Sequence, residues 1–362
     1  MSRLRMAVVG VGHLGKEHAR ILAGLPGVEL VGVADINFDQ AQTVARRHGS
    51  RAFADYWPLL NLVDAAVVAV PTTHHHEIAR AFLRRHIPLL VEKPLALSLP
   101  QAEDLVELAL RHETILQVGH IERFNPALEE LENHPLQPKF VECQRLGPYS
   151  GRSTDIGAVL DLMIHDLDLL LALVQAPVRS VEALGVTLFG RHEDVANARL
   201  VFGNGCVANL TASRASAVPV RRMHVWAPEG YAGLDFAQRS LTLVQPSEQL
   251  RRHGLGLQVF DPANLSKLPR EMFGQHLQVL KLDRAGGDQL TRELEHFIQS
   301  VQTGTRPRVS GVEGRDALAL AALVLEKIQG HQWEGRAEGP TGPLHPPEPL
   351  GPLFDTPKEE AA

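Results

Sequence analysis

Residues 4–35 (LRMAVVGVGHLGKEHARILAGLPGVELVGVAD) decide how the chain folds. The apolar segments 4–9 and 28–34 predict two buried strands, and residues 16–23 between them have a helical pattern. The glycines of a Gly-x-Gly-x-x-Gly motif, at positions 10, 12 and 15, follow the first strand and open the helix. Asp35 ends the second strand, 20 positions after Gly15. This context predicts a dinucleotide-binding βαβ unit. The alternative is a strand, turn and helix that bind no nucleotide.

The residues of this motif have separate physical roles. Gly10 permits a tight turn, Gly12 lets the backbone approach a pyrophosphate, and Gly15 lets the helix pack closely on the strand. The phosphates would lie at the helix N-terminus, where free N–H groups and the helix dipole favour negative charge.

Asp35 predicts which dinucleotide is bound. A carboxylate at this position would hydrogen-bond the ribose hydroxyls and repel a 2′-phosphate. Positions 36 and 37 are Ile36 and Asn37, so no arginine is present there to accept that phosphate. The sequence therefore predicts that the cofactor is NAD rather than NADP.

Composition restricts the class of protein. The chain has 362 residues, of which 44% are hydrophobic and 22% charged, as in a globular protein large enough for two domains. A net charge of −6 favours no nucleic-acid partner, and no apolar run approaches the roughly 20 residues that cross a bilayer. Cys143 and Cys206 are the only cysteines, and free thiols in a reducing, cytoplasmic location are expected.

The two halves of the chain have different patterns. Strands alternate with helices up to residue 122, which predicts a doubly wound parallel sheet with its ligand at the carboxyl ends of the strands. Residues 155–174 predict one long apolar helix. The segments that follow predict an antiparallel sheet with one covered face: 178–188, 195–202, 206–213, 223–226, 231–236 and 241–244. Helices are expected at 289–303 and 314–329.

The predicted fold class is therefore α/β, with three divisions. Residues 1–122 form the NAD-binding domain, and residues 123–332 form an α/β domain for substrate binding and oligomerisation. Residues 333–362 are rich in proline and are expected to be a disordered tail.

A polar cluster interrupts the apolar helix at 155–174. Asp161, His165 and Asp168 fall within about 60° of one another on a helical wheel. Burying two carboxylates and an imidazole is costly unless they pair or meet a ligand. A histidine flanked by an acid is typical of a general base. A structural His–Asp ion pair and a metal site on Asp161 and His165 are the alternatives, although no third ligand follows at a zinc-like spacing.

Four motifs resemble those of the Gfo/Idh/MocA family of nicotinamide-dependent sugar and polyol oxidoreductases, over roughly residues 4–330. They are Gly-Val-Gly-His-Leu-Gly at 10–15, Val70-Pro71-Thr72-x-x-His75, Glu92-Lys93-Pro94 and Asp161-x-x-x-His165-x-x-Asp168. The resemblance implies a Rossmann domain joined to a C-terminal α/β domain with a large, open, mainly antiparallel sheet. In many members that sheet forms the dimer contact, so a homodimer or homotetramer is expected.

The resemblance also implies roles for individual residues. Lys93 would lie between the nicotinamide and the substrate, His165 would take the hydroxyl proton, and Asp161 would orient the substrate or His165. The residues expected to bind NAD are Gly10, Gly12, His13, Leu14, Gly15, Asp35, Pro71, Thr72, His75, Glu92 and Lys93. No metal is expected, because the consecutive histidines 74–76 would point about 100° apart on a helix.

Residues 119–126 and 145–152 are similar to the branch of the family that oxidises the 3-hydroxyl of UDP-N-acetylglucosamine. In that branch the oxidation precedes transamination in making an amino sugar for lipid A. The residues expected to bind substrate are Arg123, Asn125, Arg145, Tyr149, Arg152, Asp161 and His165. The competing prediction is that the arginines form ion pairs with Glu122, Asp155 or Glu129.

Three other functions stay open from the sequence. The chain could be a dehydrogenase of inositol or of a simple sugar. Such a substrate carries no phosphate for the arginines near the helix at 155–174 to bind. It could be a non-catalytic sensor of NAD and sugar, although it keeps Lys93, Asp161 and His165. It could be a metal-dependent hydrolase that uses the Asp161, His165 and Asp168 cluster.

Overall fold

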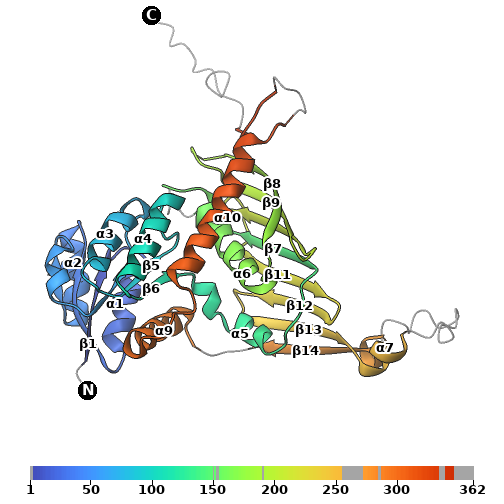
Figure 1. Cartoon of the computed structure of the whole chain (residues 1–362), viewed down its shortest axis with the longest axis horizontal. Helices are drawn as coiled ribbons and strands as arrows, with labels where there is room; N and C mark the ends of the chain where they lie inside the picture. The colour runs from blue at the N-terminus through green and yellow to red at the C-terminus, as the bar shows by residue number, and fades with distance from the viewer. Residues whose placement is uncertain are drawn as a thin grey trace, which may run out of the picture.

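The protein has two β-sheets side by side, with one long helix between them (Figure 1). The structure, a computed structural model, describes residues 3–149, 151, 155–189, 191–254, 272–283, 287–333 and 339–345. The long helix is α10 (Gly311–Gly330), which contributes buried side chains to the cores on both sides of it.

The N-terminal sheet is parallel and has six strands in the order β3-β2-β1-β4-β5-β6. Its strands are β1 (Leu4–Val9), β2 (Val28–Ala34), β3 (Arg51–Phe53), β4 (Ala65–Val68), β5 (Leu89–Glu92) and β6 (Leu116–Gly119). Its helices are α1 (Gly15–Gly24), α2 (Phe38–His48), α3 (His75–Leu83) and α4 (Leu99–Arg111). Strand order reverses between β1 and β4, and a crevice for ligand lies at such a reversal. The predicted doubly wound sheet is confirmed.

Both faces of this sheet are buried. Met6 and Val8 of β1 join the core on one face, while Ala7 and Val9 join the core on the other. Because successive side chains of a strand point to opposite faces, an unbroken apolar segment such as 4–9 fits a sheet that is covered twice.

The C-terminal sheet has eight strands in the order β14-β13-β12-β11-β7-β10-β9-β8. Only the β7–β10 pair is parallel, so the predicted mainly antiparallel sheet is confirmed. The strands are β7 (Phe140–Leu146), β8 (Val178–Val186), β9 (Val195–Phe202), β10 (Val207–Ser213), β11 (Val220–Ala227), β12 (Gly230–Asp235), β13 (Ser240–Pro246) and β14 (Leu277–Asp283). Helices α5 (Pro126–Glu132), α6 (Ile164–Val174) and α10 cover one face of it.

Among the elements that differ from the prediction are α6 and β14. The helix expected at 155–174 is divided into a π-helical turn, Val159–Met163, and the α-helix α6. Strand β14 was not predicted, because its segment LQVLKLD keeps most of its side chains exposed and pairs only with β13 at the edge of the sheet. A strand with so little burial carries a weak hydrophobic pattern.

The ends of the chain also differ from the predicted divisions. Helix α9 (Gln289–Thr303) packs into the core of the N-terminal sheet through Leu290, Leu294 and Phe297, although it was assigned to the substrate domain. Within the predicted tail, Thr341 pairs with Gln332 and Leu344 pairs with Val186, so these two residues are hydrogen-bonded to the rest of the protein. Residues 346–362 lie outside the described residues.

Two predictions from composition can be compared with the structure. Cys143 and Cys206 are both free and buried, as predicted. None of the helices in the described ranges is both long enough and apolar enough to span a bilayer.

Candidate active site

The glycine loop after β1 leaves its backbone accessible at the start of α1. A Cβ atom on Gly10, which has φ +84°, would lie 2.6 Å from the carbonyl oxygen of Ala69. A Cβ atom on Gly15 would lie 1.8 Å from the carbonyl oxygen of Gly10. Nothing lies within 4 Å of a Cβ atom on Gly12, and Gly12, His13 and Leu14 are exposed. The loop therefore fits the close approach of a dinucleotide pyrophosphate.

Asp35 lies beside this loop, at the end of β2. Its Oδ2 accepts a hydrogen bond of 2.9 Å from the backbone N–H of Val11, and its Oδ1 accepts one of 2.9 Å from that of Asn37. The residue remains half-buried. The carboxylate is thus held in one orientation at the place where the adenosine ribose would lie.

His75 joins the ends of β4 and β5. Its Nδ1 lies 2.8 Å from the carbonyl oxygen of Pro94, and its Nε2 lies 2.9 Å from that of Val70. Burial lowers the pKa of this imidazole, and the side chain is only 1% exposed. His75 therefore links the segments that follow β4 and β5, beside the other residues expected to bind NAD. Of the neighbouring residues expected to bind NAD, Thr72 is buried and Pro71 is exposed.

Glu92 is also directed into the protein. Its Oε1 lies 2.7 Å from Nε2 of His18, on α1, and both residues are buried. Burial alone would raise the pKa of Glu92, but the hydrogen bond and charge of His18, together with the charge of Lys93, lower it. Glu92 therefore links β5 to the helix that carries the glycine loop.

Lys93 reaches from the end of β5 to the π-helical turn. Its Nζ donates to Oδ1 of Asp161 at 2.9 Å and to the carbonyl oxygen of Asp161 at 2.7 Å. The turn leaves this carbonyl available to a partner outside the helix. In the described structure Asp161 therefore orients Lys93 rather than His165.

His165 lies near this ion pair. Burial lowers the pKa of its imidazole well below the usual value, and the positive charges of Lys93 and Arg145 lower it further. Within the described residues no carboxylate forms a hydrogen bond with His165, so the alternative of a structural His–Asp ion pair is not seen there. An imidazole that is neutral at pH 7 can accept a proton from a substrate hydroxyl.

Two of the arginines expected to bind substrate, Arg123 and Arg145, form ion pairs. Arg145 donates to Asp166 at 2.7 Å and to Glu122 at 2.8 Å, and all of these side chains are buried. Arg123 donates to Asp168 at 2.8 Å. The competing prediction of an ion pair with Glu122 is therefore met for Arg145, and the two acids of α6, Asp166 and Asp168, each face an arginine.

Asn125 has a structural role in the same region. Its Oδ1 caps α5 by accepting from the N–H of Ala127 at 3.0 Å, and its Nδ2 donates to Glu122 and to the carbonyl of Phe236. The side chain is 0% exposed, which leaves it no surface for a substrate.

Tyr149 remains accessible, with 43% of its surface exposed. Its ring lies 4.9 Å from that of Phe189, and the guanidinium of Arg214 lies 5.6 Å above it. Arg152 lies outside the described residues.

The histidine triplet divides as expected from helical geometry. His75 faces inward, His74 is exposed, and His76 lies 2.7 Å from Asp104. No cluster of side chains suited to a metal ion is found among the residues that the structure describes.

Arg221 was missed by the sequence reasoning. It is exposed near the start of β11, opposite Arg145 of β7, and its charge helps to lower the pKa of His165. Alternation with the buried Met223 places Arg221 on the helix-covered face of the sheet. The predicted strand began at Met223, so it did not include Arg221.

Glu193 and Asp194 were also missed. Glu193 Oε1 accepts from the N–H of Val159 at 3.0 Å, at the start of the π-helical turn. Asp194 accepts from Arg214 at 2.6 Å, and Arg214 donates to the carbonyl of Ile156 at 2.9 Å. These contacts fix the beginning of the segment that carries Asp161 and His165.

A parallel sheet with an open glycine loop, joined to a lysine and a neutral histidine, defines a dinucleotide-dependent oxidoreductase. The chain belongs to the Gfo/Idh/MocA oxidoreductase family: the domain described as "Oxidoreductase family, NAD-binding Rossmann fold" matches residues 4–120, and the "GFO/IDH/MocA C-terminal domain" matches residues 137–232.

Several individual proteins are similar to the chain over most of its length. The chain is 34% identical to the UDP-N-acetylglucosamine 3-dehydrogenase of Acidithiobacillus ferrooxidans, over 91% of this chain and 98% of the relative. A solved structure of that enzyme has a TM-score of 0.79, covering 90% of this chain and 98% of that one. The myo-inositol 2-dehydrogenase of Thermotoga maritima is 27% identical over 90% of this chain and 96% of its own. Levoglucosan dehydrogenase in complex with NADH, 17% identical with a TM-score of 0.76 over 90% and 97% of the two chains, shares the fold.

Proposed function

We propose that this oxidoreductase is an NAD-dependent dehydrogenase that oxidises the 3-hydroxyl of UDP-N-acetylglucosamine to the 3-keto sugar. The observation that carries the proposal is that Lys93, at the end of β5, and the neutral His165 lie at one site. The similarity to the Acidithiobacillus enzyme over nearly its whole length supports the choice of substrate. The keto product would be a substrate for transamination, as in the making of lipid A amino sugars, and a reducing cytoplasm would keep both cysteines as thiols.

The residues divide the chemistry between them. NAD bound at the glycine loop would supply the hydride acceptor. His165 removes the hydroxyl proton, and the ammonium of Lys93 stabilises the negative charge that develops on the substrate oxygen. Asp161 holds Lys93 in place through its carboxylate and its carbonyl. Most of the catalytic effect then comes from positioning.

Asp35 tests the choice of cofactor. We expect NAD to bind more tightly than NADP, because the 2′-phosphate of NADP would face a carboxylate that two backbone N–H groups already hold in place. In the Asp35→Ser variant the two cofactors should bind with more similar affinity. Titration of both cofactors by fluorescence would measure this, and equal binding of NADP by the unaltered protein would contradict it.

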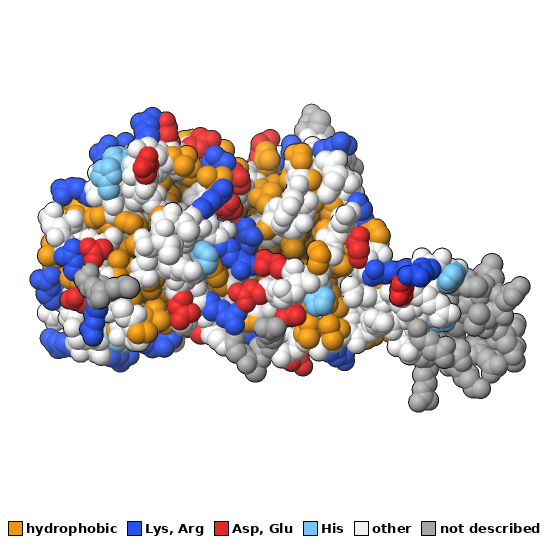
Figure 2. All heavy atoms as spheres, turned by 60° about the horizontal axis from the view of Figure 1, so that its bottom comes forward, with side chains coloured by type: hydrophobic (Ala, Val, Ile, Leu, Met, Phe, Trp, Pro, Cys, Tyr) orange, Lys and Arg blue, Asp and Glu red, His pale blue; other side chains and the backbone are white. Residues whose placement is uncertain are grey.

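A nucleotide sugar needs local positive charge for its diphosphate. Figure 2 shows Lys and Arg side chains intermixed with acids on the visible face rather than gathered in one area. Arg123 and Arg145 are already paired with acids. Arg221 is exposed next to the site, and no ion pair of its own is found among the described residues. We therefore assign the diphosphate contact to Arg221.

The Arg221→Ala variant should weaken UDP-N-acetylglucosamine binding by about 1.5–3 kcal/mol, the range for a hydrogen bond to a charged group. NAD affinity should be unchanged, because the glycine loop lies in the other half of the protein. Isothermal titration with each ligand would measure both effects. The matched control is Arg222→Ala. In the unaltered protein Arg222, the neighbour of Arg221, pairs with Asp235 at 3.1 Å. Unchanged UDP-N-acetylglucosamine binding in Arg221→Ala, or an equal loss in the Arg222→Ala control, would contradict the assignment.

Oxidation of inositol is the second candidate, since the Thermotoga relative is matched over 96% of its length. NADH absorbance during incubation with UDP-N-acetylglucosamine or with myo-inositol separates the two. We expect turnover with the nucleotide sugar; turnover with inositol alone would replace the proposal. Ligand binding without any reduction of NAD would favour a sensor.

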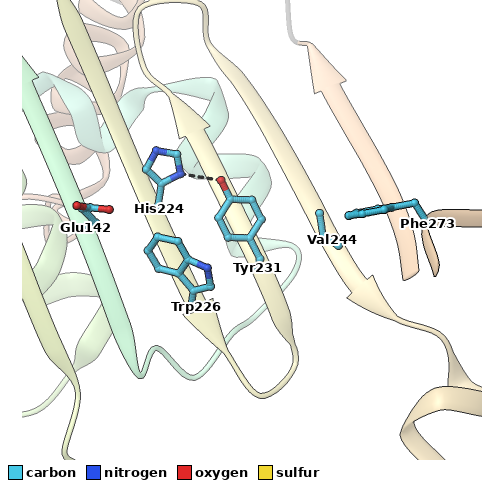
Figure 3. Close-up of a pocket in the computed structure, with 6 residues that line it drawn as sticks. All are labelled: Glu142, His224, Trp226, Tyr231, Val244 and Phe273. Carbon is cyan, nitrogen blue, oxygen red and sulfur yellow. Dashed lines mark hydrogen bonds between the residues drawn. The ribbon is translucent and has the colours of Figure 1, made fainter. Parts of the chain in front are cut away.

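The open face of the C-terminal sheet is proposed to bind a second copy of the chain. Trp226, Tyr231 and His224 extend from this face beside Phe273, and His224 lies 2.6 Å from the hydroxyl of Tyr231 (Figure 3). Neighbouring strands place a row of side chains across the sheet, with Glu182 at one end and Lys281 at the other. A two-fold axis would bring the acidic end of one copy to the basic end of the other.

The Trp226→Glu variant should lower the mass of the particle in solution to that of the 39.7 kDa chain, because it places an unpaired carboxylate in an apolar interface. Light scattering after gel filtration would measure the mass. Trp57→Glu, at an exposed tryptophan of the N-terminal domain, is the control and should leave the mass unchanged. A monomeric unaltered protein, or an oligomer that persists in Trp226→Glu, would contradict the proposed interface.

A further inference from the structure

His120 is a buried histidine that the proposed chemistry does not yet use. It follows β6 directly and is 1% exposed. Its ring meets that of His165 edge to face, with ring centroids 6.0 Å apart and an angle of 86° between the planes. It also lies in the segment 119–126 that the sequence analysis singled out. The ring of His120 therefore packs against the ring of the proposed base.

Three nitrogen atoms on these two rings have no hydrogen-bond partner among the described residues. They are Nδ1 and Nε2 of His120 and Nδ1 of His165, and all are buried. A buried polar group without a partner costs about 1–3 kcal/mol. A phenylalanine at position 120 would make the same ring contact without that cost. The presence of an imidazole here points to a use for its nitrogen atoms.

The surroundings of His120 allow it to take up a proton for a short time. Burial lowers the pKa of its imidazole, so the resting ring is neutral and has a free lone pair. The carboxylates of Asp168 and Glu92 favour a positive charge on it, while Arg123 and Lys93 oppose that charge. These groups belong to the segments that pack around it: α6, β5 and the turns that follow β5 and β6.

We infer that His120 is a positioning residue that acts through His165, by accepting the proton that leaves Nδ1 of that ring. This inference rests on the proposed role of His165 as the base. NAD bound at the glycine loop would supply the acceptor for the hydride of the carbinol carbon, and Nε2 of His165 would bond the hydroxyl proton. The proton on Nδ1 then moves to a nitrogen of His120 through one bridging water. His165 is neutral again and His120 is positive.

The proton returns to solvent when the product leaves. His165 is half-buried and is therefore the exit from the pair, whereas His120 has almost no exposed surface. The cycle is balanced: one hydride goes to the cofactor and one proton goes to water. Sharing the proton with a second ring avoids a full imidazolium charge on His165 next to Lys93.

The test is the His120→Phe variant, which keeps the ring and removes both nitrogens. We expect kcat to fall by about tenfold or more, while KM for NAD and for UDP-N-acetylglucosamine stays within about twofold. The acid limb of the pH profile of kcat should move to higher pH, because a charged His120 no longer opposes protonation of His165. The thermal midpoint should be equal or higher, because an unsatisfied polar ring is replaced by an apolar one.

Two further variants keep the outcome decisive. His120→Gln retains a polar side chain that cannot take up a proton, so its kcat should fall as well; it replaces His120→Phe if that variant does not fold. His165→Ala is measured in parallel. If His165→Ala is inactive and both His120 variants turn over normally with an unmoved pH profile, the inference fails and the proposed base stands. If His165→Ala retains turnover, the proposed base itself is wrong.

Discussion

Replacing His165 with alanine is expected to lower kcat by about 10²–10⁴-fold, the usual contribution of a positioned general base. His165 is the neutral imidazole at the site, and burial and Lys93 hold its pKa well below the usual value. NAD binding should be unchanged, because the glycine loop and Asp35 lie on other elements. Stopped-flow measurement of NADH formation at saturating substrate would give the change in kcat.

The control for this experiment is His253→Ala. His253 ends α7 (Glu248–His253), which extends from the far end of the C-terminal sheet (Figure 1). This variant should retain normal turnover. Near-normal turnover of His165→Ala, with intact folding and NAD binding, would remove His165 from the mechanism.

Replacing Arg145 with alanine is expected to lower the free energy of unfolding by about 3–5 kcal/mol, the cost of breaking a buried ion pair from one side. Asp166 and Glu122 would be left buried without their arginine. Burial already raises the pKa of the Asp166 carboxyl even with Arg145 present. Equilibrium unfolding in urea would measure the loss.

Arg221→Ala is the matched control for stability, because the Arg221 side chain is exposed. Its free energy of unfolding should change by no more than about 0.5 kcal/mol. Comparison of the two variants therefore distinguishes a structural role for Arg145 from a substrate-binding role for Arg221. An Arg145→Ala variant of unchanged stability but weakened UDP-sugar binding would restore the substrate role first predicted for Arg145.

The nucleotide-binding half could be predicted because its signals are local. A run such as 4–9 is buried on both faces, and the glycines and Asp35 sit at fixed distances along one βαβ unit. Each of these features depends on neighbours within about 35 residues. The parallel direction of the strands then follows from the alternation of strands and helices.

The ion pairs of the catalytic helix could not be predicted in the same way. An ideal helix places Asp161, His165 and Asp168 together, but Asp161 lies in the π-helical turn at Val159–Met163 whereas the other two lie in α6. Which acid meets which arginine is decided by the packing of α6 against β7 and the turn after β6. The contact between Arg145 and Asp166 spans 21 residues of sequence, and no local pattern encodes it.

The positive charge next to the site was predicted on Arg123, Arg145 and Arg152, whereas the proposed diphosphate contact is Arg221. Arginines near the motifs were selected by their position in the sequence, whereas Arg221 comes from β11, the strand that pairs with β7. A predicted strand that began two residues earlier would have placed Arg221 on the inner face with Met223. Extending the predicted strand to include its polar first residues would have identified Arg221 as a candidate.

The proposed reaction transfers a hydride from C3 of UDP-N-acetylglucosamine to NAD. The most direct measurement uses substrate with deuterium at C3 and follows the label by mass spectrometry. We predict that the NADH formed carries one deuterium and that the sugar product carries none. NADH that forms without the label, or a sugar that keeps its deuterium while NADH forms, would contradict the proposed function.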